Sequence, residues 1–436
     1  MWERAKGGAE FAIGVVAQAP DRHTRPACAM SGAHTRRRRR KIRVLALGAL
    51  GLAAALTSAA TLAPGRDGRV ARSYVPRDAS VVVARVPRRT PGELAARATL
   101  AASPERIELA VALARLDIQR ARTLGDPRYL GRAQATLSRW WTLRAPPPEV
   151  LLLRATIEQS LHAFGAARAD LDELIRIRPD DAQAHLTRAV VAMVTGDYPA
   201  ARASCAAVAR GASSLAGETC AASVAAITED PVQAYQGLAR ALGAEPDRDP
   251  AVRAWALTTL AEIAIQRGER RDAGDRLRAV LAIDPEDAYA LGLLADVLLD
   301  DDRPRDASSL LAGREPVDAL LLRRAIAEHR VQGREAVELA HRMRERFAAE
   351  AERGDRVHLR EHARFALEVD GDPARAVALA MENWGVQHEL ADARLLLACA
   401  LAAGRPDLAA PVVGWARQVR VHDAALDRLL VRLGAP

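Results

Sequence analysis

Glu149-Val-Leu-Leu-Leu-Arg-Ala-Thr156 aligns with Gln183-Ala-His-Leu-Thr-Arg-Ala-Val190 when the sequence is shifted by 34 residues. The agreement continues downstream, where Ala167 aligns with Ala201. A repeat of this length accommodates two short helices and the turns between them. The stretch therefore predicts an all-α chain built from repeated helix pairs.

Small residues recur at the positions where the two helices of a pair would cross. In each case an alanine is followed one turn later by a larger residue and then by a turn residue. These sets are Ala167, Leu171 and Pro179; Ala273, Leu277 and Pro285; Ala201, Cys205 and Ser213; and Ala307, Leu311 and Ala319. Alanine permits close approach of two helices, and the larger residue fills the neighbouring groove. Gly268, Gly371 and Gly404 are expected at turns, because glycine tolerates positive φ.

The pattern resembles the tetratricopeptide repeat family over residues 104 to 420, most clearly at 148–213 and 254–315. Arg154-Ala155 and Arg188-Ala189 stand where that family usually has Leu-Gly. The resemblance implies an α-solenoid whose concave groove, lined by the first helix of each pair, holds a protein or peptide segment. It also implies an exported, bacterial-type member of the family that acts without catalysis.

The N-terminal part of the chain is predicted to direct export. Residues 30–63 carry a positive run at Arg36–Lys41, an uncharged apolar stretch at Val44–Leu56 and small residues up to Ala63, the order found in secretory signals. Residues 1–29 are then a doubtful leader, interpreted as a start-site artefact. The alternative is an uncleaved membrane anchor at 44–63. Both interpretations place the rest of the chain outside the cytoplasm, in the periplasm or beyond.

Residues 64–103 are predicted to be a linker or extended arm, and residues 104–436 the solenoid. Within the linker, Val81–Val86 could form a short strand, and the nearby Pro87 and Pro91 oppose a helix.

The charge distribution argues against a nucleic-acid partner. The whole formal net charge of +8 belongs to residues 1–63, and the remainder of the chain is balanced. Nucleic-acid-binding domains usually carry a basic face on the folded part. We therefore expect no nucleic acid among the partners.

Arg154 and Arg188 occupy equivalent positions of two repeats, 34 residues apart. They could form a ladder in the groove that binds an acidic peptide. The alternative is that both are surface arginines paired with nearby acidic residues.

His358-Leu-Arg-Glu361-His362 fits the pattern H-x-x-E-H. On a helix the two histidines share a face and could bind zinc, with Glu361 as the catalytic base. The alternative function is therefore a zinc-dependent hydrolase, although short patterns of this kind arise easily in a helical sequence.

Three cysteines follow the leader. Cys205 and Cys220 are expected on neighbouring helices of successive repeats, where an exported chain could join them in a disulfide. The alternative is two small buried core residues. Cys399 is expected to stay free and buried.

The function favoured by the sequence is an exported, non-catalytic binding or assembly scaffold with no cofactor. A third possibility is the same scaffold tethered to a membrane through residues 44–63.

Overall fold

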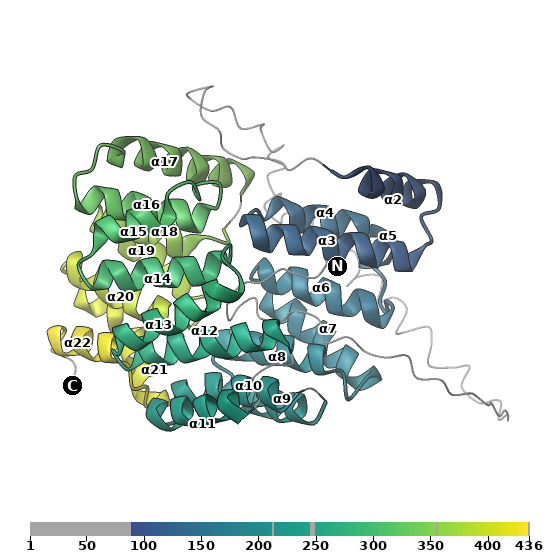
Figure 1. The fold of residues 1–436 in the computed structure, drawn as a ribbon, viewed down its shortest axis with the longest axis horizontal. Coiled ribbons are helices and arrows are strands. Elements are labelled where there is room, and N and C mark those ends of the chain that lie inside the picture. The colour runs from purple at the N-terminus through teal and green to yellow at the C-terminus, as the bar shows by residue number, and fades with distance from the viewer. Residues whose placement is uncertain (1–88, 212, 245–248, 355, 435–436) are drawn as a thin grey trace, which may run out of the picture. The chain divides into compact units, whose positions relative to one another are not determined.

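The computed structural model describes residues 89–211, 213–244, 249–354 and 356–434 (Figure 1). Two compact units divide the chain, and one contains all of these residues except Glu352–Gly354. Every contact described below lies within that unit. The secondary structure of the described residues is helical, without a strand. The predicted leader at 1–29, the signal or anchor at 30–63 and the arm at Val81–Val86 lie outside the described residues.

The helices follow one another in pairs, in which the first helix is called helix A and the second helix B. One helix, α2 (Pro91–Ala102), precedes the pairs. The pairs are α3 (Ile107–Leu124) with α4 (Arg128–Thr136) and α5 (Ser138–Trp141), α6 (Pro148–Ser160) with α7 (Phe164–Ile177), α8 (Ala182–Val194) with α9 (Tyr198–Gly211), α10 (Ser214–Thr228) with α11 (Pro231–Ala244), α12 (Pro250–Gln266) with α13 (Arg270–Ile283), α14 (Ala288–Asp300) with α15 (Pro304–Leu311), α16 (Asp318–Arg330) with α17 (Ala336–Arg353), α18 (Leu359–Glu368) with α19 (Pro373–Trp384), and α20 (Leu390–Ala402) with the 3₁₀ helix η1 (Pro406–Ala409) and α21 (Ala410–Val419). The last helix is α22 (Ala424–Arg432).

The 34-residue period holds residue for residue between two neighbouring pairs. Moving the bounds of α6 and α7 by 34 gives the bounds of α8 and α9. The turn between the helices also repeats, because His162 and Gly196 both have positive φ, 59° and 78°. Gly268, at φ 80°, makes the same turn between α12 and α13. The prediction of repeated helix pairs is confirmed.

Two segments differ from the sequence prediction. Part of the predicted linker at 64–103 forms α2, because Thr90 caps the helix by accepting a hydrogen bond from the Glu93 amide at 3.2 Å. Pro91 lies in the first turn, where its missing N–H breaks no helical hydrogen bond.

The second difference is Ala319, which was aligned with Pro285 in a turn. It lies inside α16 instead, because α15 ends early at Leu311 and Gly313 turns the chain at φ 80°. The repeat built on α14 and α15 is therefore shorter than those before it.

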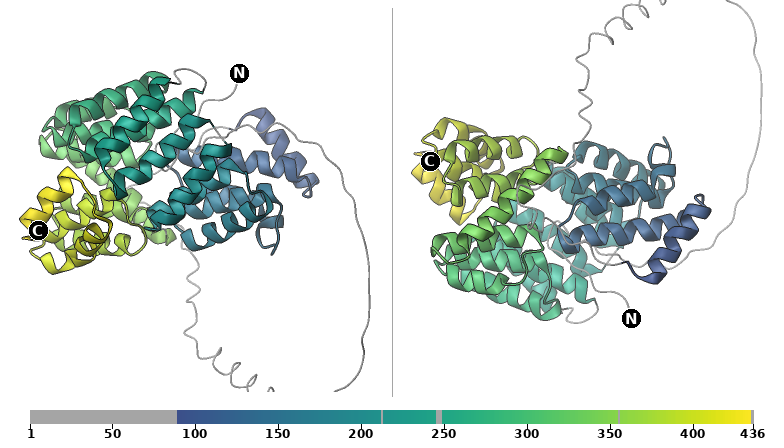
Figure 2. Two further views of the ribbon diagram at one scale, coloured as in Figure 1. Left: turned by 90° about the horizontal axis from the view of Figure 1, so that it is seen from below. Right: turned by 90° about the horizontal axis from the view of Figure 1, so that it is seen from above.

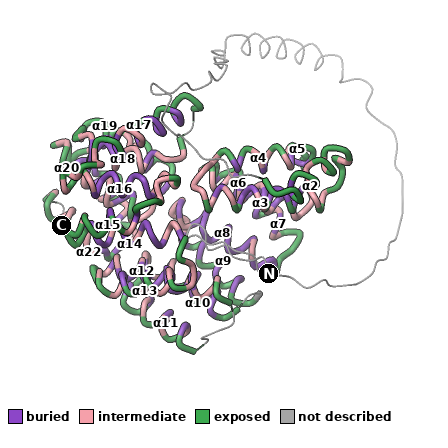
Figure 3. Tube along the Cα trace, turned by 45° about the horizontal axis from the view of Figure 1, so that its top comes forward, coloured by how far each residue is buried: buried purple, intermediate pink, exposed green. Residues whose placement is uncertain are grey.

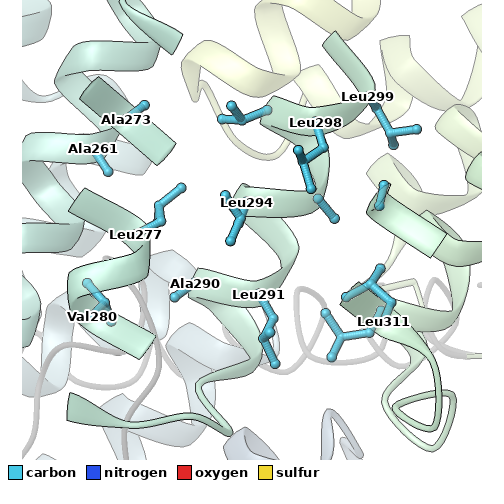
Figure 4. Close-up of a cluster of buried hydrophobic side chains, with 14 of the residues drawn as sticks. Ala261, Ala273, Leu277, Val280, Ala290, Leu291, Leu294, Leu298, Leu299 and Leu311 are labelled. Carbon is cyan, nitrogen blue, oxygen red and sulfur yellow. The ribbon is translucent and has the colours of Figure 1, made fainter. Parts of the chain in front are cut away.

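Helices A and B bury their side chains differently. Helices α8, α12 and α14 are apolar on nearly all sides and are largely buried; Figure 3 draws α8 mostly in purple. Among the helices B, α13 is amphipathic, with a buried stripe and a charged outer face. Figure 4 shows the resulting core, in which Ala261 of α12, Leu277 of α13 and Leu294 of α14 point toward one another. Helices α8, α12 and α14 thus lie largely in the interior of the array.

No helix in the described part of the chain is long and apolar enough to cross a membrane. The predicted anchor at 44–63 lies outside that part.

Candidate functional site

Arg154 and Arg188 are both engaged with carboxylates of α7. The Arg154 guanidinium donates to Asp170 at 2.5 and 2.6 Å and also to the Trp141 carbonyl. Arg188 donates to Asp172 at 2.6 Å and to the Ser204 hydroxyl at 3.0 Å. An acidic ligand would have to compete with these internal partners, so the binding role of the two arginines stays a prediction.

His358 and His362 lie on one face of α18, as the H-x-x-E-H spacing predicts, but they meet a carboxylate. The two imidazoles bond the two oxygens of Glu350, at 2.9 Å from His358 Nδ1 and 3.1 Å from His362 Nε2. Burial lowers the pKa of His358, but the bond to Glu350 outweighs this and raises it to about 9. The imidazolium that results is a poor metal ligand, since a ligand must be deprotonated.

Glu361, the predicted catalytic base, does not take part in this arrangement. Burial raises the pKa of its carboxyl, and the charges of His358 and Arg360 reverse the effect, so that the net shift is downward. Among the described residues, no group of three or more His, Cys, Asp or Glu side chains is arranged to hold a metal ion. The arrangement therefore gives the hydrolase hypothesis no support.

A row of ion pairs and hydrogen bonds links successive helices A, and we call it the helix-A ladder. It consists of Tyr289 of α14 with Glu262 of α12, Asp296 of α14 with Arg323 of α16 and Arg364 of α18, and Arg360 of α18 with Asp392 and Glu389 at the start of α20. The Tyr289 hydroxyl lies 2.5 Å from Glu262, and Arg364 lies 2.7 Å from Asp296. Most of these side chains are half-buried, so they join the helices and still reach solvent.

Two carboxyl groups of the ladder have shifted pKa values, in opposite directions. It raises the pKa of Glu262 to about 7, although the hydrogen bond from Tyr289 opposes the shift. Burial also raises the pKa of Asp296, but the charges of Arg323 and Arg364 outweigh it and the net shift is downward. The ladder therefore combines Glu262, whose pKa is raised into the neutral range, with Asp296, whose pKa is lowered.

The sequence analysis missed the ladder. Its partners lie 27 residues apart for Glu262 and Tyr289 and for Asp296 and Arg323, and 32 apart for Arg360 and Asp392. This separation joins neighbouring helices A and is a usable signal. It is a weak one, because the chain contains 63 basic and 55 acidic residues and many pairs satisfy it by chance.

Cys205 of α9 and Cys220 of α10 are joined by a disulfide, with a Cα–Cα separation of 5.3 Å. The bond connects helix B of one repeat to helix A of the next, as the sequence analysis expected. Cys399 is free and buried.

The C-terminal helices contact the middle repeats along the turns that follow helices A. The His388 amide donates to the Val194 carbonyl at 2.8 Å, and the Trp415 indole donates to the Tyr198 hydroxyl at 3.2 Å. The Gln266 side chain donates to the His422 carbonyl at 2.7 Å. In both views of Figure 2 the yellow C-terminal helices lie against green helices. We call these six residues the clasp.

Comparison with known proteins gives distant structural similarity alone. No protein-family model and no curated protein matches the chain. One similar solved structure is a tetratricopeptide repeat protein from Parabacteroides merdae, with 17% sequence identity and a TM-score of 0.35, where the match covers 58% of this chain and 98% of that one. Another is the APC/C hetero-tetramer Cut9–Hcn1, with 11% identity and a TM-score of 0.38, covering 78% of this chain and 81% of that one.

The helices of the described residues follow one another as consecutive pairs, with small buried residues at the crossings and a positive-φ residue in many of the turns between helices A and B. The 34-residue spacing relates α6 and α7 to α8 and α9, and the other pairs are longer or shorter. The described part of the chain is an all-α array of helix pairs.

Proposed function

We propose that this chain is a non-catalytic scaffold that binds a protein or peptide segment outside the cytoplasm. The observation that supports binding is the helix-A ladder, a row of half-buried charges on consecutive helices of one array. Charges arranged in this way can exchange internal partners for groups on an extended segment, and charge complementarity then fixes its register. Helices A line the concave face of tetratricopeptide-like arrays, which is where such a segment would lie.

Affinity capture from an extracytoplasmic extract tests the scaffold. The full chain, tagged at its C-terminus, is compared with Arg323→Gln and with a control, Arg176→Gln. Arg323 belongs to the ladder. When Arg323 is replaced, its partner Asp296 still pairs with Arg364. Arg176 is exposed on α7 and pairs only locally with Glu173. We expect a saturable partner that Arg323→Gln loses and the control keeps. If both variants retain the same proteins, the ladder is not the binding surface. If the wild-type chain captures no saturable partner, the scaffold proposal is contradicted.

The finer proposal is that Arg154 and Arg188 take part in binding an acidic segment. The captured partner is titrated against the double variant Arg154→Ala, Arg188→Ala. Weaker binding of at least tenfold is expected if both arginines leave Asp170 and Asp172 for the ligand. Unchanged affinity would leave the two arginines with a structural role only.

Export is supported by the signal-like pattern at 30–63 and by the disulfide between Cys205 and Cys220, since disulfides persist in oxidising compartments. Determining the N-terminal residue of the chain in the extracytoplasmic fraction tests it. A start near residue 64 indicates a cleaved signal, and an intact 44–63 indicates a membrane tether. In the cleaved form, thiol counting after denaturation without reductant should find one free thiol. Three thiols, or a chain confined to the cytoplasm, would contradict export.

A further inference from the structure

The buried apolar side chains form separate clusters, and the clasp bridges two of them. One cluster belongs to α6–α10 of the middle repeats, and another to α18–α22 at the C-terminal end. Among the residues that the structure describes, the partly buried apolar side chains that pack against both clusters are Ile227, Trp415 and Val419. The two clusters are thus joined there by a small apolar contact together with the hydrogen bonds of the clasp.

The two sides of the clasp are held differently. On the middle side, the disulfide from Cys205 to Cys220 ties α9 to α10. On the C-terminal side the cysteine is free and buried, and the helices are held by their own apolar cluster, in which Leu396 and Leu397 are fully buried. Each side therefore has internal contacts that do not depend on the other side.

We propose that the C-terminal helices α18–α22, which share one apolar cluster, undock from the middle repeats at the clasp as a unit, while the helix pairs on both sides stay folded. The contact at the clasp is small and partly exposed to solvent, whereas the two clusters are buried. The free energy of a local opening is lower where less buried apolar contact is lost, so the clasp should open before either cluster. Opening exposes the aromatic and aliphatic side chains of the clasp and its neighbours: Tyr198, Ile227, Trp415 and Val419. The solenoid thereby contains a built-in opening step. This inference does not depend on the proposed function.

Native-state hydrogen exchange of the full chain, read by mass spectrometry with residue-level fragmentation, measures the opening. The His388 amide reports directly, because its hydrogen-bond acceptor is the Val194 carbonyl across the clasp. We expect it to exchange at least tenfold faster than the amides of Leu260 in α12 and Leu396 in α20, both fully buried. Equal rates at the three positions would overturn the proposal.

Tyr198→Phe weakens the clasp without removing the ring from its cluster, and Tyr235→Phe is the matched control. Tyr235→Phe removes a hydroxyl that donates to Asp272 and accepts from Arg276 at 3.1 Å, both contacts between α11 and α13 and not part of the clasp. Loss of one hydrogen bond should raise the exchange rate of the His388 amide about fivefold in Tyr198→Phe. That amide should be unchanged in the control, and Leu260 and Leu396 unchanged in both. Equal acceleration at all three positions in Tyr198→Phe would show that the clasp opens only with global unfolding.

A cross-link gives the converse test. A Cβ at Gly268 would lie 3.2 Å from the Ala424 Cβ, which is close to the spacing of a disulfide. The oxidised double variant Gly268→Cys, Ala424→Cys is compared with Gly268→Cys alone, which carries the same backbone strain at φ 80°. The cross-link should slow the exchange of the His388 amide to the rate of Leu396. An unchanged rate would place the opening elsewhere and refute the proposal.

Discussion

The junction between α2 and α3 and the crossing of α12 and α13 are held by opposite chemistries. The only buried residue of α2 is Glu93, whose carboxylate accepts hydrogen bonds from Arg97 at 3.0 Å and from Arg120 at 2.7 and 2.6 Å. Arg97 also reaches Asp117 of α3 at 2.8 and 2.9 Å. The α12–α13 crossing, in contrast, is made of apolar side chains, with Ala261, Ala273 and Leu277 fully buried (Figure 4).

The comparison distinguishes the apolar packing that stabilises the helix pairs from the ion pairs that position α2. Apolar burial contributes in proportion to area and depends little on direction, so a crossing of Ala and Leu accumulates stability across the repeats. A buried ion-pair network offsets its own desolvation only in one geometry, so it fixes where α2 docks and adds little net stability. Substitutions that remove side-chain volume should therefore affect the core most, and substitutions that remove a charge should affect the docking of α2 most.

The largest effect is expected from Leu277→Ala in α13. The substitution removes buried carbon and leaves a cavity, and we expect it to lower the free energy of unfolding by about 3 kcal/mol. Leu94→Ala in α2 is the control, because Leu94 is 51% exposed and should change stability by less than about 0.5 kcal/mol. Chemical denaturation measures both. Comparable losses for the two leucines would show that α2 is part of the same apolar core.

The next effect is local and concerns charge. Asp117→Asn removes one of the two buried carboxylates that pair with Arg97 and leaves Glu93 at 3.0 Å, so the loss should be smaller than the about 3–5 kcal/mol expected for a buried charge with no partner. Because α2 is the first described helix and can detach, we expect the loss to appear as release of α2, with exchange of its amides at least tenfold faster. The thermal midpoint of the remaining helices should stay the same. A fall in that midpoint as large as that of Leu277→Ala would contradict separable docking.

The two regions should also differ in their response to pH. The hydrogen bonds from Arg120, opposed by burial, lower the pKa of Glu93 to about 2. A lowered folded-state pKa means that Glu93 stabilises docking above its ordinary pKa of 4.5, and the contribution is lost as pH falls from 4.5 to 2. Glu262 behaves in the opposite sense, since burial raises its pKa to about 7. Its contribution is present below pH 4.5 and is lost as pH rises through 7.

Glu262→Gln isolates the second of these effects. Glutamine stays neutral, so the variant should lose less stability than the wild type between pH 4.5 and pH 7. Glu158, whose pKa burial also raises to about 7, remains in the variant, so part of the slope should persist. Thermal midpoints measured across this range provide the check. Parallel curves for wild type and variant would show that Glu262 is not protonated in the folded chain near pH 5.

The helix pairs could be predicted from sequence because their signal is local and repeated. Ala273 and Leu277 lie one helical turn apart, and the spacing between helices can be found by aligning the sequence with itself. The charged contacts could not be predicted in the same way. The face shared by His358 and His362 followed from their spacing, whereas their partner Glu350 comes from α17 and no pattern names it. Likewise, no sequence pattern indicates that Glu93 is buried, because one of its partners, Arg120, lies 27 residues away on α3.

The smallest effect is expected where the same chemistry is fully exposed. Arg176 donates from two nitrogens to the two oxygens of Glu173 at 2.8 and 2.6 Å, so this pair on α7 is at least as short and as well aligned as the pair of Arg97 with Asp117, in which one nitrogen donates to both oxygens. We expect Glu173→Gln to leave the thermal midpoint unchanged, because water and salt screen an exposed pair and ordering its side chains costs entropy. The measurement is a thermal melt at low and at physiological ionic strength. Amide exchange of α7 gives the comparison with Asp117→Asn, which is expected to speed the exchange of α2 at least tenfold. If Glu173→Gln sped the exchange of α7 as much, geometry alone would decide the worth of an ion pair, and burial could not be the reason that α2 responds to charge.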